Sequence, residues 1–274
     1  MSAEQIADTV VQAEFLVRPD GTVRGDDGAS GALAAALPYT GRLARRMGEL
    51  VGAGDLRLME AFGLRRLLVG VTWTPAGEGT FRAAVTPLEP RTVTTFMVVG
   101  GADTPAAVAH CVGRLSAVDG VRWSSVVSAD SRVIAAAGEP QDLHHLAEVG
   151  HRMLAILGSL QDQHATGFMR LRFEQGAVVG ASLGRHALVA FTWSVEDADL
   201  FGMIDEIRAI LADHDLASVT TQLVQQLDDP AGAEPAEPGQ APVRPVLPVG
   251  ARYRGAARGG GKPQKTARRG RFGR

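Results

Sequence analysis

The stretch LVRPDGTV at Leu16–Val23 has the same pattern as VVSADSRV at Val126–Val133. Each stretch reads as an apolar strand, a polar turn that holds an Asp, and a return strand, which is the signal of a β-hairpin. In the first turn, Pro19 fixes φ and Gly21 accepts a positive φ. A unit that recurs after roughly a hundred residues predicts two copies of one small domain packed as a pseudo-dimer. This organisation favours a binding or scaffolding protein over an enzyme with a single cleft.

A helix is predicted after the first hairpin, from Ser30 as its N-cap to about Val51. Pro38 lies inside the apolar stripe of this helix and should start or kink the helix there. Strands are then expected over Leu56 to Phe62, Leu67 to Trp73, Phe81 to Val85 and Val93 to Val99. The next helix should begin with Thr104 as its cap and Pro105 at its first helical position.

The second unit shows the same order of elements more clearly. Its hairpin is expected over Arg122 to Val127 and Arg132 to Ala136, and Asp142 should cap the helix that follows. Met169–Phe173 alternates strictly between apolar and charged residues, which predicts a strand with one wet face. Further elements are expected over Ala177 to Leu183, Ala187 to Trp193, a helix from about Glu196, and an amphipathic segment from Leu216 to Leu227.

Two alignments of the units are possible beyond their first helix. Leu68–Trp73 resembles Leu188–Trp193, and this match would leave Phe81–Val99 without a counterpart in the second unit. The other alignment treats Val93–Val99 as the last strand of the first unit and residues 74–92 as an insertion. We adopt the second alignment because a helix directly follows that strand.

The stretch VVSADSRVIAAAG at Val126–Gly138 resembles the first hairpin of the roadblock/LC7 family. That hairpin usually reads apolar-x-Ser/Thr-x-Asp-Gly and continues as a strand of small residues; here Ser131 stands in the place of the usual Gly. The following helix and strands come in the family's order. The resemblance covers residues 122–212 well and residues 10–118 weakly, and it includes no catalytic signature.

The resemblance implies an α+β fold (an α/β sandwich of profilin/longin-like type) in which each domain is an antiparallel five-stranded sheet with helices on both faces. Two such domains in this family pair through a helix and an edge strand into one longer sheet. We therefore expect a first roadblock-like domain over residues 1–119, with the insertion at 74–92, and a second over 120–228. Bacterial members typically bind and regulate small Ras-like GTPases or serve as scaffolds, and the tandem could form the pair within one chain.

The C-terminal part of the chain differs in composition from the rest. Residues 229–251 are rich in Pro, Ala and Gly without periodicity, which predicts an extended, disordered linker. Residues 252–274 hold nine basic residues and no acidic one, so this tail should also be disordered when unbound. With a total charge of −2, residues 1–251 carry −11. The tail's candidate polyanion-binding residues are Arg252, Arg254, Arg258, Lys262, Lys265, Arg268, Arg269, Arg271 and Arg274.

Several classes of protein are disfavoured by composition. No apolar run reaches the roughly eighteen residues that a membrane-spanning helix needs. The first residues are polar and acidic rather than basic, so no signal peptide is expected and the predicted location is cytoplasmic. Cys111 is the single cysteine, which excludes an internal disulfide; its helical apolar setting indicates a small core residue rather than a nucleophile.

No constellation in the sequence indicates catalysis, so we predict no enzyme activity and no cofactor. The chain has no GxxxxGK[ST] phosphate loop and no strand-Gly-x-Ser-x-Gly-helix context. It should therefore not be a GTPase itself. His144, Glu148 and His151 share one helix face and could contribute to a zinc site, but we interpret them as a solvated face because no further ligand cluster is evident, and we predict no metal.

Two sets of arginines are candidate partner-binding residues: Arg170 and Arg172 on the predicted wet strand face, and Arg42, Arg45 and Arg46 on the first long helix. They could pair with acidic groups of a partner or of the other unit, or form an ordinary solvated face. Trp73, Trp123 and Trp193 lie near predicted strand ends, where core or interface packing is expected rather than ligand stacking.

Two functions remain open at this point. The first is a non-enzymatic adaptor of the roadblock type whose folded body binds a small GTPase or another regulatory protein. The second is a nucleic-acid-associated protein that uses its Arg/Gly tail while the body dimerises or recruits. An acidic body favours the first, because a folded reader of nucleic acid usually presents a basic face. The tail permits contact with nucleic acid or an anionic membrane surface as an accessory activity.

Overall fold

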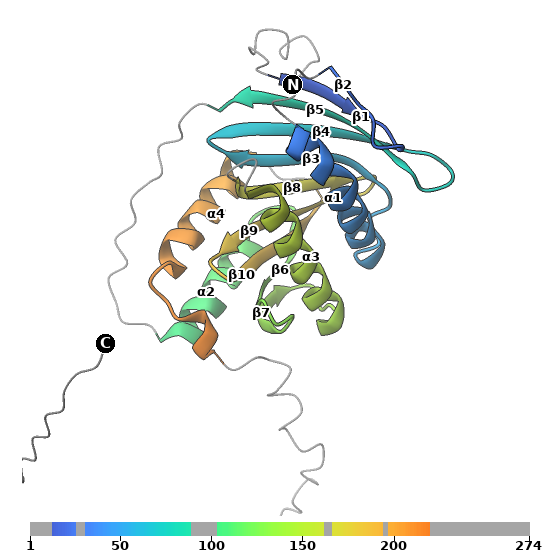
Figure 1. Ribbon diagram of the computed structural model, residues 1–274. Coiled ribbons are helices and arrows are strands. Elements are labelled where there is room, and N and C mark those ends of the chain that lie inside the picture. The colour runs from blue at the N-terminus through green and yellow to red at the C-terminus, as the bar shows by residue number, and fades with distance from the viewer. Residues whose placement is uncertain (1–12, 26–30, 89–102, 162–165, 194–196, 220–274) are drawn as a thin grey trace, which may run out of the picture. The chain divides into compact units, whose positions relative to one another are not determined.

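The structure, a computed structural model, describes residues 13–25, 31–88, 103–161, 166–193 and 197–219 (Figure 1). The chain divides into two compact units, residues 1–230 and 231–274, and every described residue lies in the first. The elements before residue 100 are β1 (Ala13–Val17), β2 (Val23–Arg24), α1 (Gly31–Leu50), β3 (Leu56–Gly63), β4 (Arg65–Trp73) and β5 (Gly79–Pro87). Those after it are α2 (Thr104–Ser116), β6 (Val121–Val127), β7 (Val133–Gly138), α3 (Leu143–Gln161), β8 (Thr166–Phe173), β9 (Ala177–Leu183), β10 (His186–Thr192), α4 (Asp197–Leu211) and the short 3-10 helix η2 (Leu216–Ser218).

All ten of these strands belong to one antiparallel sheet, in the order β2-β1-β5-β4-β3-β8-β9-β10-β6-β7. The order is the same from either end if β6 to β10 are matched in turn with β1 to β5. Each half of the sheet is therefore built from a hairpin, a helix and three strands. β3 and β8 meet at the centre, and the α+β class and the single longer sheet agree with the expectation from sequence.

The two hairpins that open the halves have the same turn. In the first, the Arg18 N–H donates to the Thr22 carbonyl at 2.9 Å; in the second, the Ser128 N–H donates to the Arg132 carbonyl at 2.8 Å. Gly21 has a φ of 81°, and Ser131 at the matching place has a φ of 57°. Ser131 is the one non-glycine residue with positive φ in the described part of the chain, so it occupies a conformation that normally selects glycine.

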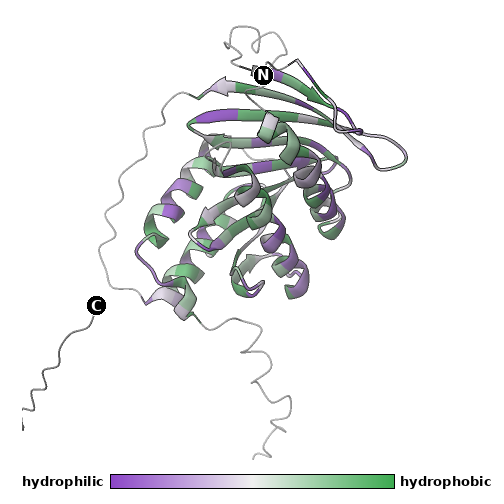
Figure 2. Cartoon of the chain, in the orientation of Figure 1, coloured by the Kyte–Doolittle hydropathy of each residue, from purple (hydrophilic) through white to green (hydrophobic). Residues whose placement is uncertain are grey.

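The helices cover the sheet on two faces. α1 and α3 pack against each other on one face, above a core that includes Met59, Val69 and Val189. α2 and α4 pack on the opposite face, with the neighbouring strand residues Val179 and Leu188. Because successive residues of a strand point to opposite faces, these adjacent positions identify two separate cores. In Figure 1 the two helix pairs lie on different sides, and Figure 2 shows green and purple residues side by side along the helices.

Two details of the helices correct the sequence prediction. α1 continues from Gly31 through Pro38, so of the start or kink expected at Pro38, the start is wrong. Asp103, not Thr104, caps α2: its Oδ1 accepts the Ala106 N–H at 2.9 Å. The predicted cap of α3 is confirmed, since Asp142 Oδ1 accepts two N–H groups of the first turn of that helix.

The prediction of an insertion at residues 74–92 is wrong for the part that the structure describes. Residues 79–87 form β5, which pairs with both β1 and β4 and thus holds the place of β10 in the other half. Val93–Val99, which we expected there, lies outside the described residues. The error arose because β5 and the segment after it are both apolar, and periodicity alone does not tell which one joins the sheet.

The position of α2 also bears on the expected division at residue 119. This helix precedes that boundary in sequence but packs on β6 and β7, which follow it. By its contacts, α2 belongs with the second half. The predicted helix over Leu216–Leu227 is described only in its first residues, where η2 forms; the linker and the basic tail lie outside the described residues.

Candidate functional site

Four charged side chains meet where β3 and β8 pair at the centre of the sheet. Their register places Glu60 opposite Arg170, with Leu58 opposite Arg172. Paired residues of an antiparallel sheet point to the same face, so Glu60 and the two arginines share the face that carries α4. We call Glu60, Arg66, Arg170 and Arg172 the seam cluster.

Glu60 is the centre of the seam cluster. One oxygen, Oε2, accepts from Arg170 Nε at 2.5 Å and lies 3.1 Å from Arg172 Nε. The other oxygen, Oε1, accepts from Arg66 Nη2 at 2.7 Å. Glu60 is 1% exposed and Arg170 is 4% exposed. A buried carboxylate is thus held by guanidinium groups from β4 and from β8, one on each side of its own strand.

The electrostatics of Glu60 follow from these contacts. Burial by itself raises the pKa of Glu60, but the hydrogen bonds and charges of the surrounding arginines outweigh burial and hold the pKa below its ordinary value. The carboxylate is therefore ionised at neutral pH. Removing one partner of a buried ion pair lowers the free energy of unfolding by about 3–5 kcal/mol, because the remaining charge stays buried without compensation. The same change in a surface pair costs about 1 kcal/mol or less.

Three aromatic rings pack against each other beside the buried part of the seam cluster. Phe62 stacks on Phe168 across the same strand pair, with ring centroids 4.6 Å apart and planes 9° from parallel. Phe201 of α4 packs on both rings at 4.8 and 4.5 Å. The Arg170 guanidinium lies 5.5 Å from the centre of the Phe201 ring, within the range of a cation–π contact. α4 is thereby fixed over the centre of the sheet.

The prediction of a wet face for Arg170 is therefore wrong, although the alternation of Met169–Phe173 is correct. Arg170 lies under α4, whereas the side chain of Arg172 is 46% exposed. Both arginines pair with Glu60 of the other half of the sheet, which is one of the three alternatives that the sequence left open. Glu60 itself was missed. The sequence feature that could have identified it is a single carboxylate inside the apolar run Leu58–Phe62.

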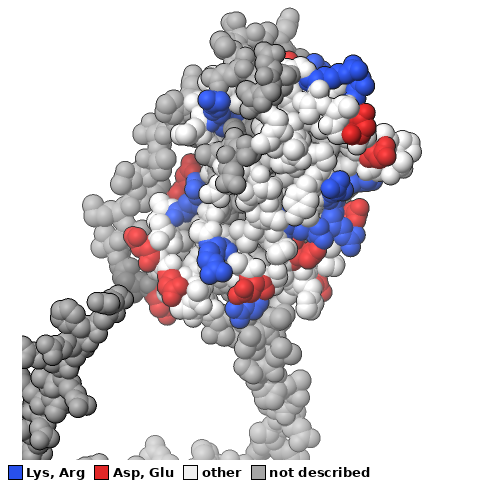
Figure 3. All heavy atoms as spheres, viewed as in Figure 1, with Lys and Arg blue, Asp and Glu red and all other residues white. Residues whose placement is uncertain are grey.

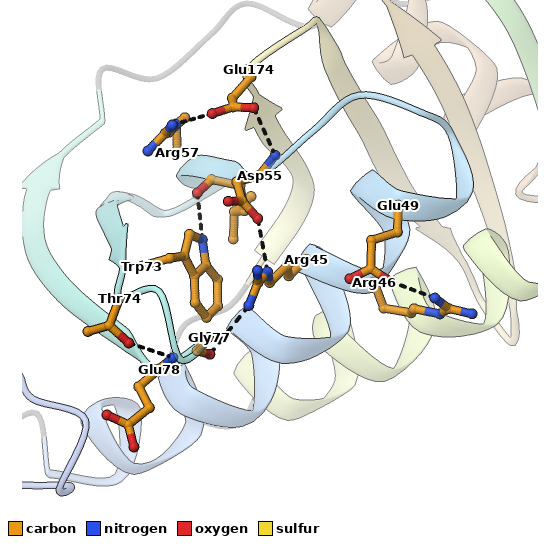
Figure 4. Close-up of polar contacts among 11 residues, drawn as sticks. Arg45, Arg46, Glu49, Asp55, Arg57, Trp73, Thr74, Gly77, Glu78 and Glu174 are labelled. Carbon is orange, nitrogen blue, oxygen red and sulfur yellow. Dashed lines mark hydrogen bonds and ion pairs between the residues drawn. The ribbon is translucent and has the colours of Figure 1, made fainter.

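A second cluster of polar contacts joins α1 to the start of β3 and the end of β4 (Figure 4). Arg45 Nε donates to Asp55 Oδ1 at 2.9 Å, and its guanidinium lies 4.8 Å from the ring centre of Trp73. Trp73 Nε1 in turn donates to the Leu56 carbonyl at 2.9 Å. Arg45, which we predicted as a partner-binding residue, thus makes contacts within its own half.

The other two arginines of α1 lie further out. Arg46 Nη1 pairs with Glu49 on the same helix at 2.5 Å, and Arg42 is exposed. An ion pair with both partners more than half exposed contributes little to stability. On the face that Figure 3 shows, positive and negative side chains are interspersed between wide uncharged areas.

The remaining candidates are placed as follows. His144 and His151 are exposed on α3, and no group of three or more His, Cys, Asp or Glu residues suited to a metal occurs within the described ranges. Cys111 is confirmed as a buried core residue, and burial raises the pKa of its thiol to about 11. Trp123 is buried in the core; Trp193 is 49% exposed, so it is not a core residue, and the interface packing that was the other expectation for it stays a prediction. None of the helices in the described segments is long and apolar enough to cross a membrane.

Comparison with known proteins finds solved roadblock/LC7 structures that are similar to this fold. MglB of Myxococcus xanthus is 16% identical, with a TM-score of 0.37 over 42% of this chain and 92% of that chain. A roadblock/LC7 domain from Streptomyces avermitilis is 14% identical, with a TM-score of 0.32 over 39% and 92%. The gliding protein MglB from Thermus thermophilus is 18% identical, with a TM-score of 0.35 over 44% and 96%. No family model and no curated protein matches the chain. The chain is similar to these structures, and its own fold is defined by the strand order and helix placement above.

Proposed function

We propose that this chain is a non-enzymatic adaptor that binds and regulates a small Ras-like GTPase. It would do so as two roadblock-like domains joined in one chain, a pair that in this family is often made by two chains. The observation that carries the proposal is the ten-stranded sheet with the same order from both ends, with α1 packed against α3 beside its centre. This is the arrangement that the roadblock/LC7 resemblance of residues 122–212 implies.

The internal contacts support an adaptor with a fixed body. The seam cluster joins the two halves through a buried charge, and Phe201 of α4 covers the joint. Such a body presents a rigid surface that a partner can recognise without reorganisation of the adaptor, which lowers the cost of binding. The contacts of α2 with β6 and β7 support a division in which this helix belongs to the second domain and the boundary lies before Thr104.

The outer surface of α1 carries two of the predicted partner-binding arginines in positions that remain available for a partner. Arg42 is exposed and Arg46 is more than half exposed, whereas Arg45 and Arg170 are used internally. Rim arginines of this kind act mainly on the rate of association and on the choice of partner. We infer that Arg42 and Arg46 contact acidic groups of the GTPase.

The tail supports a second, accessory activity. Nine cations without an acid in residues 252–274, joined to a body of charge −11, favour contact with a polyanion such as nucleic acid or an anionic membrane surface. The linker composition would allow this contact without any movement of the folded body.

The direct test is binding of the full-length chain to the small Ras-like GTPases encoded nearest to its gene. Each GTPase is loaded with GDP or with a non-hydrolysable GTP analogue, and the dissociation constant is measured by isothermal titration calorimetry. We expect one GTPase to bind, with a preference for one nucleotide state, and its GTP hydrolysis rate to change when the adaptor is added. The adaptor alone should not hydrolyse GTP.

The matched control uses charge reversals of equal size. Arg42→Glu with Arg46→Glu should weaken binding by about tenfold or more. Arg132→Glu with Arg185→Glu, two exposed turn positions distant in sequence from α1, should leave binding nearly unchanged. No binding by any GTPase, or equal loss in both variants, would contradict the proposal.

A further inference from the structure

A small cavity lies next to the seam cluster, at the end of the β8–β9–β10 strands. Its volume is about 270 Å³, and it is lined by side chains that include Arg170, Arg172, Thr192, Trp193 and Leu200. Leu200 comes from the first turns of α4, so the cavity lies between the sheet and that helix. The paired strands and the ion pairs of the seam cluster leave this space unfilled.

The register of three strands explains why the cavity exists. Ala177 pairs with Arg172 on one side and with Thr192 on the other. The three residues therefore point to one face in a row, with a methyl group between two longer side chains. Neighbouring strands are about 4.8 Å apart, so Arg172 and Thr192 are separated by about 10 Å at the backbone. That spacing leaves room for one oxyanion group above Ala177.

Thr192 gives the strongest indication of a ligand. Its side chain is 4% exposed, and its Oγ1 is buried without a hydrogen-bond partner in the described structure. A buried hydroxyl that makes no hydrogen bond costs about 1–3 kcal/mol, and such groups are rare in folded proteins. Thr192 is one of the residues that line the cavity, and a bound acceptor that reaches its hydroxyl would remove this cost.

Arg172 supplies the charge that such an acceptor would need. Its closest contact with Glu60 is through Nε at 3.1 Å, so the two Nη groups lie outside that contact, and the side chain is 46% exposed. A guanidinium presents its Nη groups in a planar fork that suits phosphate and carboxylate oxygens. The acidic side chains described nearby are Glu60, which is shared by the seam cluster, Glu174, which pairs with Arg57, and the exposed Asp199.

We propose that this cavity binds the phosphate or carboxylate group of a small molecule, with Arg172 as the cationic donor and Thr192 as the hydroxyl donor. The volume is close to the lower end of the range for ligand pockets, which favours a small anion over a whole nucleotide. Binding would link the end of α4 to the centre of the sheet. The proposal is independent of the GTPase proposal, because it concerns a different face of the sheet from α1.

The experiment is a titration of the full-length protein with sodium phosphate and, separately, with sodium acetate, with ionic strength held constant by sodium chloride. The indole N–H resonance of Trp193, assigned with a Trp193→Phe variant, reports binding at the cavity. We expect saturable shifts with at least one of the two anions. Stronger binding of phosphate or of acetate identifies which group the site prefers.

Two variants and two matched controls test the residues. Arg172→Gln and Thr192→Val should each weaken binding by about tenfold or more, because each removes a hydrogen bond to a charged group. Arg82→Gln on β5 and Thr72→Val on β4 change the same residue types at exposed positions and should bind as the wild type does. All variants keep the basic tail, so anion binding there is common to every titration.

The outcomes are distinguishable. Absence of a saturable shift with both anions would overturn the proposal, and so would unchanged binding in Thr192→Val, which preserves the shape of the side chain. If Arg172→Gln disturbs the fold through Glu60, Thr192→Val and its control still decide the question.

Discussion

The two halves of the sheet share one strand order but differ in how they are covered. In the second half, α3 packs on one face and α2 with α4 on the other. In the first half, α1 covers one face, and no described helix covers the opposite face of β4 and β5. Correspondingly, Leu188 and Val179 are 1% exposed, whereas Leu68 and Ala84 are only half-buried.

This difference explains why the second half is the clearer one in sequence. A strand buried on both faces is apolar at every position, as in Ala187–Phe191, whereas a strand buried on one face alternates. Gly79–Pro87 therefore carries Arg82 among its apolar residues. Two halves with the same strand order can therefore differ in which faces of their strands are buried. We infer that the second half contributes more of the free energy of unfolding than the first. We also infer that the ion pairs of Glu60 couple the unfolding of the two halves.

The largest effect is expected where the halves meet. Glu60→Gln removes the buried carboxylate from Arg66, Arg170 and Arg172 and should lower the free energy of unfolding by about 3–5 kcal/mol. Chemical denaturation measures this change. Glu14→Gln is the matched control, because Glu14 pairs with Arg82 at the surface and should cost less than about 1 kcal/mol. A similar cost for both would mean that the seam holds the halves together no more strongly than a surface pair does.

The same variant has a characteristic pH dependence. The pKa of Glu60 is lowered on folding, so its contribution to stability is complete above its ordinary pKa of 4.5 and is lost as the pH falls through the lower folded value. The difference in unfolding free energy between the wild type and Glu60→Gln should therefore shrink below about pH 4.5. A difference that stays constant down to strongly acidic pH would show that charge on Glu60 is not the cause.

A pair of identical substitutions compares the covered and uncovered faces. Leu188→Ala, under α2 and α4, should cost about 2–5 kcal/mol, because it leaves a cavity in a closed core. Leu68→Ala, on the half-buried face, should cost about 1 kcal/mol, because less apolar surface is lost. Thermal or denaturant unfolding gives both values. Equal costs would indicate that the face of β4 is as well covered in solution as that of β10.

Two glycines of α3 provide a finer comparison within one helix. A Cβ added at Gly150 would overlap with Val127 of β6, whereas one added at Gly158 has no heavy atom within 4 Å. Gly150→Ala should destabilise the protein by about 1–3 kcal/mol through overpacking. Gly158→Ala should stabilise it by about 0.5–1 kcal/mol, because alanine loses less conformational freedom in a helix. Opposite signs in thermal unfolding are the expected result; stabilisation by both would mean that α3 can move away from β6.

Most local features of the fold were predictable from sequence, whereas the choice of strand partners was not. The hairpin turn around Ser131, the cap Asp142 and the strand pattern of Met169–Phe173 depend on neighbouring residues, and the structure has them as expected. The choice of β5 over Val93–Val99 depends on which apolar segment pairs with β1. That choice is made by the whole sheet, so periodicity alone could not settle it.

The candidate site shows the same limit. The sequence indicated Arg170 and Arg172 as charged residues able to meet an acidic group of a partner or of the other half, but it did not identify Glu60, which lies 110 residues away from Arg170. A single carboxylate in an apolar strand is a usable signal, since such a group needs a buried partner. The pairing itself requires the β3–β8 register, and the cavity beside Thr192 requires the register of three strands.

The smallest effect on stability is expected from removal of the basic tail. Deleting residues 250–274 should change the free energy of unfolding by less than about 0.5 kcal/mol, because we expect the linker to uncouple the tail from the folded body. The comparison of the two halves should therefore be the same in the shortened chain. Differential scanning calorimetry of both chains measures this.

Binding to polyanions should respond to the same deletion in the opposite way. Nine cations release counterions on binding, so the affinity of the full-length chain for DNA, RNA or anionic vesicles should fall steeply as salt rises, and the shortened chain should bind weakly at every salt concentration. Fluorescence anisotropy at low and near-physiological salt is suitable for the nucleic acids, and vesicle co-sedimentation for the lipids. If both chains bind equally, or if binding does not depend on salt, the tail makes no polyanion contact and the charge asymmetry of the chain serves solubility alone.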